Sequence, residues 1–144
     1  MSYYSRIDME IKADNLREII AKILKDKNYA EAHQYEEIPY YELFVGNDSM
    51  LEYLDELEYE AKHIRKNASK VIFKLYDECN HFDFFMKRDW LREFKKYSQE
   101  MPNATFVIHQ KNEEEEYYEW EIKNGKAAKR QMVVVLKGKE WEEV

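Results

Sequence analysis

Six carboxylates and three large aromatic side chains crowd into the fourteen-residue stretch "NEEEEYYEWEIKNG", which runs from Asn112 to Gly125. Its four consecutive glutamates could bind a hard cation, because such ions take several oxygen ligands at once. Neighbouring residues of a strand point to opposite faces, so these four acids do not converge on one ion without a partner loop. The run therefore predicts a solvated acidic surface and no metal site.

A second candidate for chemistry is the pair Cys79 and His81 in "ECNH". A structural zinc ion takes four protein ligands and a catalytic one takes three, and no other histidine or cysteine pair has a suitable spacing. As a nucleophile, Cys79 has His81 nearby but no evident third group to orient it. The remaining histidines are His33, His63 and His109.

Other catalytic signatures are absent from the sequence. There is no G-x-S-x-G nucleophile motif, and the three glycines are isolated, so none forms a phosphate-binding loop. We therefore predict no catalytic residue and no cofactor. An enzyme whose site is assembled from scattered residues stays open as an alternative.

The composition indicates one soluble domain, residues 1–144, in a reducing compartment. The formal net charge is −7 and 37% of the residues are charged. A single cysteine excludes an intrachain disulfide and suits the cytoplasm. The first residues lack the features of a secretory signal, and no apolar run is long enough to cross a bilayer. Excess negative charge disfavours a general binder of nucleic acid or anionic membranes.

Hydrophobic periodicity predicts the elements that must position these residues. "SRIDMEIK" alternates, with Ile7, Met9 and Ile11 on one face, as in a strand that covers a core. A helix follows, with apolar residues at helical spacing. Residues 28–46 are ambiguous: "YAEAHQYEE" could be a helical turn or a loop, and "IPYYELFV" suggests a short strand. Asp48 or Ser49 would cap a helix through residues 50–67, with Leu57 on its flank.

The second half predicts one more helix and four strands. "SKVIFKLYDE" reads as a strand with Val71, Phe73 and Leu75 inward, and "CNHFDFFMK" as an aromatic loop. Asp89 would cap a helix that ends before Pro102. "ATFVIHQK", the acidic stretch and "KAAKRQMVVVL" would form three strands. The Asn124-Gly125 pair is the strongest short hairpin signal, because both residues tolerate positive φ.

The predicted element order is β-α-(β)-α-β-α-β-β-β. We therefore expect the α+β class: a ferredoxin-like sandwich whose mainly antiparallel sheet carries helices on one face. Its other face would be solvated, with Arg6, Asp8, Glu10, Glu119 and Glu121 among its side chains.

Two segments resemble the YubB-type ferredoxin-like domains of plasmids and phages. They are "YYSRIDMEIKADNLREIIAKI" and the region from "IFKLYDECNHFDFF" to "EYYEWEIKNG", about half of the chain. The second keeps a strand, an aromatic loop, a helix, a "P-x-x-x-F" strand entry and an acidic-aromatic hairpin in that order. The resemblance implies a mobile-element origin and a small effector role, such as an inhibitor of a host defence nuclease.

The leading functional hypothesis is a non-enzymatic interaction module that offers an acidic, tyrosine-rich surface to a basic protein partner. Cationic grooves of nucleic-acid-handling proteins suit such a surface. Tyrosine is also favoured at protein interfaces. The residues predicted to bind the partner are Glu113, Glu114, Glu115, Glu116, Tyr117, Glu119 and Glu121.

Two further alternatives stay open. Tyrosines on an open sheet face could stack on bases, as in RNA-recognition domains, with lysines and arginine at positions 123–130 contacting phosphates. Mixed charges on that face oppose this alternative, so we regard nucleic acid as the less favoured partner. The "MVVVL" run would also permit a homodimer formed by pairing of edge strands.

Overall fold

The computed structural model describes residues 5–46, 49–51, 53–76, 88–112 and 117–132, together with Trp141 and Glu143. Within these ranges the chain forms five strands and four helices. They are β1 (Ser5–Lys12), α1 (Leu16–Ala32), α2 (Tyr41–Phe44), α3 (Leu54–His63), β2 (Lys70–Tyr76), α4 (Arg88–Ser98), β3 (Thr105–Asn112), β4 (Tyr117–Lys123) and β5 (Lys126–Met132).

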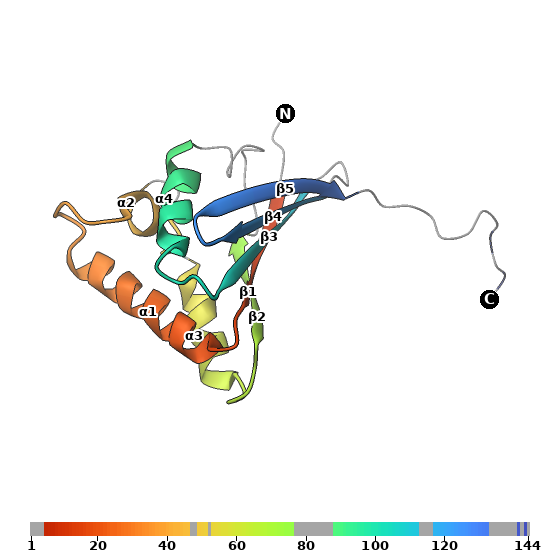
Figure 1. Ribbon diagram of the computed structural model, residues 1–144, viewed down its shortest axis with the longest axis horizontal. Helices are drawn as coiled ribbons and strands as arrows, with labels where there is room; N and C mark the ends of the chain where they lie inside the picture. Colours follow the sequence, from red (N-terminus) through yellow and green to blue (C-terminus); the bar gives the residue numbers. More distant parts are fainter. Residues whose placement is uncertain are drawn as a thin grey trace.

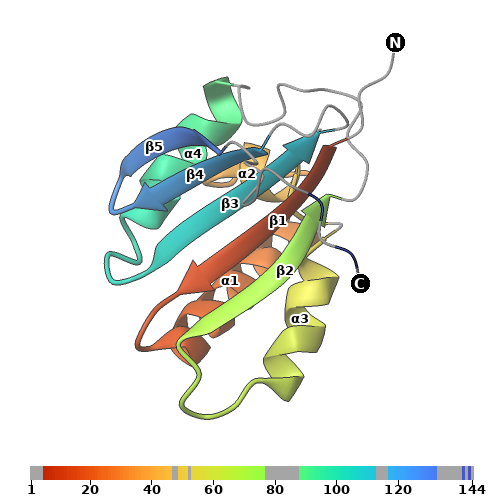
Figure 2. The same ribbon diagram turned by 90° about the vertical axis from the view of Figure 1, so that its right-hand side faces the viewer.

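One antiparallel sheet forms the framework of the molecule. Its strand order is β2-β1-β3-β4-β5. The helices lie behind the sheet in Figure 2 and to its left in Figure 1, so they cover one face. The predicted α+β class with an antiparallel sheet is confirmed. The ferredoxin-like part of the prediction is not, because the strand order differs from that of the βαββαβ fold.

Alternation along the strands places one set of side chains against the helices. Ile7, Met9 and Ile11 of β1 are fully buried, as predicted. Val71, Phe73 and Leu75 of β2 are buried as well. From the helical layer, Leu16, Ile20, Leu54, Trp90 and Phe94 join them in one hydrophobic cluster. Removal of this apolar surface from water, worth about 25 cal/mol per Å², is the main force that holds the two layers together.

The strand expected within residues 38–45 is wrong. Residues 41–44 form the short helix α2, and residues 28–32 belong to α1. Leu43 and Phe44 are both buried although they are neighbours in sequence, which a strand with one covered face does not allow. Tyr40 precedes α2 with φ 60° and ψ 37°, so the chain turns sharply into the helix.

The helix predicted over residues 50–67 is shorter than expected. α3 begins at Leu54, so Ser49 is not its cap, and Asp48 lies outside the described residues. Leu57 is fully buried and belongs to the inner stripe, whereas the sequence placed it on a flank. Leu57 lies three residues after Leu54 and four before Ala61, spacings that place all three on one face of the helix.

The predicted turn between β4 and β5 is present and is tied to a helix. Asn124 and Gly125 have φ 46° and 81°, the positive values that a two-residue hairpin turn requires. The Gly125 N–H donates to Ser98 Oγ at 2.8 Å, and that hydroxyl donates to the Lys95 carbonyl at 2.7 Å. Ser98 thereby fixes the β4–β5 turn against the end of α4.

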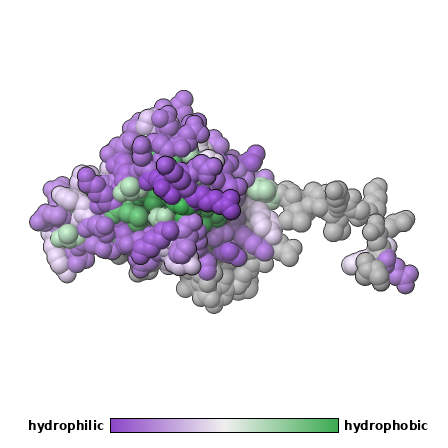
Figure 3. Space-filling view, turned by 90° about the horizontal axis from the view of Figure 1, so that it is seen from below, coloured by the Kyte–Doolittle hydropathy of each residue, from purple (hydrophilic) through white to green (hydrophobic). Residues whose placement is uncertain are grey.

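The helical layer leaves an apolar strip on the underside of the molecule. Seen from below, where α1 and α3 lie lowest in Figure 1, hydrophobic residues gather in an elongated strip (Figure 3). An open groove of about 380 Å³ between these helices is lined by Ile20, Leu24, Ala61 and Ile64, among others. Within the described ranges, no helix has the length and apolar character needed to cross a membrane.

Candidate interaction surface

The candidate interaction surface is the outer face of the sheet, on the side opposite the helices. The strand register shows which of its side chains are neighbours. It faces the viewer in Figure 2, and no described helix covers it. Cross-strand pairing aligns Lys70 with Lys12 at one side and Lys123 with Lys126 at the other, with Thr105 between them beside Lys12. We call these four lysines the lysine row. At the usual strand separation of about 4.8 Å, the row crosses the sheet over about 19 Å.

The next row of the same face is acidic. Glu10 of β1 pairs with Ile72 and Val107, and Val107 pairs with Glu121, which lies opposite Ala128. We call Glu10 and Glu121 the acidic row. The row beyond it is mixed, and crosses the sheet through Lys74, Asp8, His109, Glu119 and Arg130. Charge on the outer face is therefore arranged in bands that run across the strands.

The described part of the outer face is basic on balance, although the chain is acidic. It carries eight lysines and arginines against four acids. The cations are Arg6, Lys12, Lys70, Lys74, Lys111, Lys123, Lys126 and Arg130, and the acids are Asp8, Glu10, Glu119 and Glu121. With a net charge of −7 for the whole chain, the excess of acid lies elsewhere.

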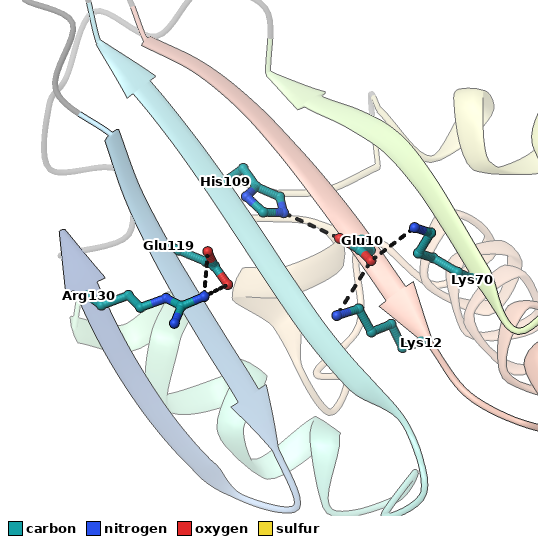
Figure 4. Close-up of polar contacts among 6 residues, drawn as sticks. All are labelled: Glu10, Lys12, Lys70, His109, Glu119 and Arg130. Carbon is teal, nitrogen blue, oxygen red and sulfur yellow. Dashed lines mark hydrogen bonds and ion pairs between the residues drawn. The ribbon is translucent and has the colours of Figure 1, made fainter. Parts of the chain in front are cut away.

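Glu10 is the electrostatic centre of this face, as Figure 4 shows. Only 8% of the residue is exposed, and its carboxylate lies 3.6 Å from Lys12, 3.9 Å from Lys70 and 3.3 Å from His109 Nε2. Three basic groups around one carboxylate offset the cost of removing it from water. Because Lys12 and Lys70 are directly opposite each other, Glu10 also reduces their mutual repulsion.

Glu119 is held by a cation of the neighbouring strand. The Arg130 guanidinium donates to both oxygens of the Glu119 carboxylate, at 3.0 and 3.1 Å (Figure 4). A single guanidinium nitrogen, Nη2, makes both contacts, which are charge-assisted hydrogen bonds. A partner that approached Glu119 would have to share or displace Arg130.

The predicted site residues divide into two groups. Glu113, Glu114, Glu115 and Glu116 lie outside the described residues, so their role stays a prediction. Tyr117, Glu119 and Glu121 lie together on β4, and all three belong to the outer face, as expected. Lys111 lies over the Tyr117 ring, with its ammonium 5.5 Å from the ring centroid. Among the described residues, therefore, the predicted acidic surface is one acidic band beside a larger number of cations.

The basic tip proposed for residues 123–130 is divided between the two faces. Lys123, Lys126 and Arg130 lie on the outer face. Lys129 belongs to the inner side, where its ammonium lies 4.6 Å from the Tyr118 ring centroid and 5.0 Å from that of Trp120. This cation–π contact covers the edge of the core beyond the helices, which is a structural role.

The lysine row was not foreseen from the sequence. Alternation places each of its members on the correct face, but only strand register shows that they share one row. One signal was present: Lys123 and Lys126 flank a two-residue turn, so they must be directly opposite each other. Like charges directly opposite destabilise a sheet, so this pair has no evident role in stability.

No group of three metal-binding side chains occurs within the described ranges. Cys79 and His81 lie outside those ranges. His33 and His63 each donate a ring N–H to the backbone carbonyl four residues earlier, at 2.8 and 2.9 Å. His109 contacts Glu10, as described above. The described histidines are thus engaged in local contacts.

Comparisons with family models, with curated proteins and with solved structures find no match to this chain. The resemblance to the YubB-type domains therefore stays a prediction. What the molecule does must be argued from its surfaces.

Proposed function

We propose that this protein is a non-enzymatic interaction module. Its outer sheet face would bind a protein that presents a row of acidic side chains and, beside it, a basic side chain. The supporting observation is the register of the sheet, which aligns the lysine row beside the acidic row. A partner would place acidic side chains against the lysines and a basic side chain against Glu121. Complementary patterns of this kind give an interface its orientation and specificity.

The banding favours a protein over nucleic acid as the partner. A phosphate backbone is uniformly negative and gains affinity with each cation that it neutralises. On this face it would meet Glu10 and Glu121 next to the lysines, and Tyr117, a described tyrosine of the face, lies at one end. A protein surface carries both signs of charge and matches such a pattern without this penalty.

The proposed partner differs in one respect from the one expected from the sequence. A purely basic partner would be repelled by the eight cations of the described face, whereas a partner of mixed charge is not. The resemblance to mobile-element proteins points to a nucleic-acid-handling defence protein as the first candidate to test. Such an inhibitor would act by occupying a surface, and it would need no catalytic residue.

Capture from the native host with the purified protein as bait tests this function. The decisive bait carries Lys123→Glu with Lys126→Glu, which replaces one like-charged cross-strand pair with another and so keeps the fold. Its control carries Lys25→Glu with Lys62→Glu, two exposed lysines of the helical layer, and has the same net charge. We expect the captured partner to be lost with the first variant and kept with the second.

Two results would overturn the proposal. If both variants retain the partner equally, the lysine row does not take part. If nuclease treatment abolishes capture and a single-stranded oligonucleotide binds the purified protein in filter-binding assays, the face binds nucleic acid, with the steep salt dependence of such complexes.

A further inference from the structure

A hollow of about 320 Å³ lies in the helical layer, away from the outer sheet face. It is bounded by the second half of α1, by the segment that leads into α2, and by the turn after α4. Apolar groups form most of its wall, through Tyr29, Ile38 and Phe44, while Asp26 and Glu100 bring carboxylates to it. The volume is at the lower end of the range for small-ligand sites.

The polar groups of this pocket belong to an ordered network. Tyr97 donates its hydroxyl to Asp26 Oδ2 at 2.6 Å. The Lys22 ammonium lies 2.9 Å from the same oxygen and 3.4 Å from Glu100. Two carboxylates therefore share one ammonium, so the cluster keeps an excess of one negative charge beside an apolar wall.

Tyr40 gives the pocket its aromatic corner. Its left-handed backbone is uncommon for a bulky residue and is held by the packing around it. The Tyr40 and Tyr97 rings meet edge to face, with centroids 5.0 Å apart. Burial, followed by the hydrogen bond to Glu100 and the charge of that carboxylate, raises the pKa of Tyr40 to about 12. The ring therefore stays neutral and can face a cation.

We propose that this pocket binds a small organic cation with an apolar body. An ammonium or guanidinium group would lie against Asp26 and Glu100, and its carbon atoms against Tyr29 and Phe44. The excess negative charge selects a cation, and aromatic walls favour one further through their negative ring faces. The site neither uses the outer sheet face nor depends on the partner proposed for it.

Phenethylamine, which is an ammonium at neutral pH, is the probe for this site. Calorimetric titration at low salt should show binding of phenethylamine and at least about tenfold weaker binding of its neutral analogue 2-phenylethanol. A peptide with one arginine between glycines is titrated in the same way as a second probe. Binding of both cations would identify a protein side chain as a source of the ligand, and binding of phenethylamine alone would identify a free amine.

Matched variants test the assignment of the carboxylate. Glu100→Gln should weaken phenethylamine binding about tenfold, the loss expected for one charge-assisted hydrogen bond. Glu58→Gln is the control, because Glu58 has similar exposure and also contacts a lysine, Lys27, at 3.6 Å. Its affinity should stay within about twofold. Equal binding of the amine and the alcohol, no binding of either at millimolar concentration, or equal effects of the two variants would overturn the proposal.

Discussion

Glu10 on the sheet face and Lys27 in the helical layer are both nearly buried charged side chains, but their charges have opposite sign. Glu10 is a nearly buried acid among Lys12, Lys70 and His109. Lys27 is 5% exposed and lies among three acids: Asp55 at 3.1 Å, Glu58 at 3.6 Å and Glu31 at 3.7 Å. Each nearly buried charge is therefore surrounded by side chains of the opposite sign.

The difference shows that the outer sheet face and the α1–α3 part of the helical layer carry opposite charge biases. The described residues between positions 16 and 64, which form α1, α2 and α3, carry ten acids and five lysines or arginines. The outer sheet face has the reverse bias. A net charge of −7 therefore describes neither region, and the two regions can attract different partners.

Reversal of the charge at Lys27 should have the largest effect on the free energy of unfolding. Burial alone would lower the pKa of Lys27, but the hydrogen bond to Asp55 and the charge of Glu31 outweigh it and raise that pKa. Lys27→Glu would place a buried carboxylate among three acids. We expect the free energy of unfolding to fall by about 3–5 kcal/mol in urea denaturation. Lys25→Glu, an exposed neighbour, should change it by less than about 0.5 kcal/mol, and equal effects would show that Lys27 is effectively solvated.

Removal of the Glu10 charge should have a smaller effect, because the cations around Glu10 are half exposed and can return to water. Glu10→Gln should lower the free energy of unfolding by about 1–3 kcal/mol. Glu121→Gln, which changes the exposed acid of the same row, should lie within about 0.5 kcal/mol of the wild type. If the two substitutions cost the same, the contacts of Glu10 contribute nothing measurable.

The pocket tyrosines predict a pH dependence of the helical layer. Burial and the interaction with Asp26 raise the pKa of Tyr97, and the pKa of Tyr40 is about 12. A raised pKa means that the folded state holds the proton more tightly, so this stability is complete below about pH 10 and is lost as the pH rises through about 12. Tyrosinate absorbance should show two late-titrating groups. Tyr40→Phe and Tyr97→Phe should each remove one, and an unchanged titration would contradict the assignment.

The Glu119–Arg130 pair should have the smallest effect on stability. A double-mutant cycle with Glu119→Gln and Arg130→Gln should give a coupling of about 0.2–1 kcal/mol, as for exposed cross-strand pairs. Urea denaturation measures it, and added salt should reduce it. A coupling near zero would mean that Glu119 is available to a partner without competition from Arg130.

Local patterns predicted much of the fold. Alternation placed β1 and β2 correctly, and Asn124-Gly125 placed the last hairpin, because strand faces and tight turns depend on adjacent residues. α2 was missed because "IPYYELFV" has the aromatic and branched residues of a strand. Its conformation follows instead from the turn at Tyr40 and from contacts with distant elements, such as the Glu42 N–H that donates to Glu93 at 2.7 Å.

The candidate surfaces were harder to predict than the fold. The alternation of side chains along a strand indicates which of them face outward. Prediction of the lysine row also requires the register between β1 and β3, whose residues are about a hundred positions apart. The acidic pocket depends on α1 and the end of α4, brought together by packing. No short sequence pattern contains either arrangement.

One measurement tests the central claim, that the banded outer face docks a protein of complementary charge. It is the dissociation constant of the captured partner for the wild type and for Glu121→Lys, which turns the exposed acid of the acidic row into a cation. A banded partner presents a positive group there, so the account predicts binding weakened by about tenfold or more. Unchanged or tighter binding by Glu121→Lys, the response of a uniformly anionic partner such as nucleic acid, would contradict it.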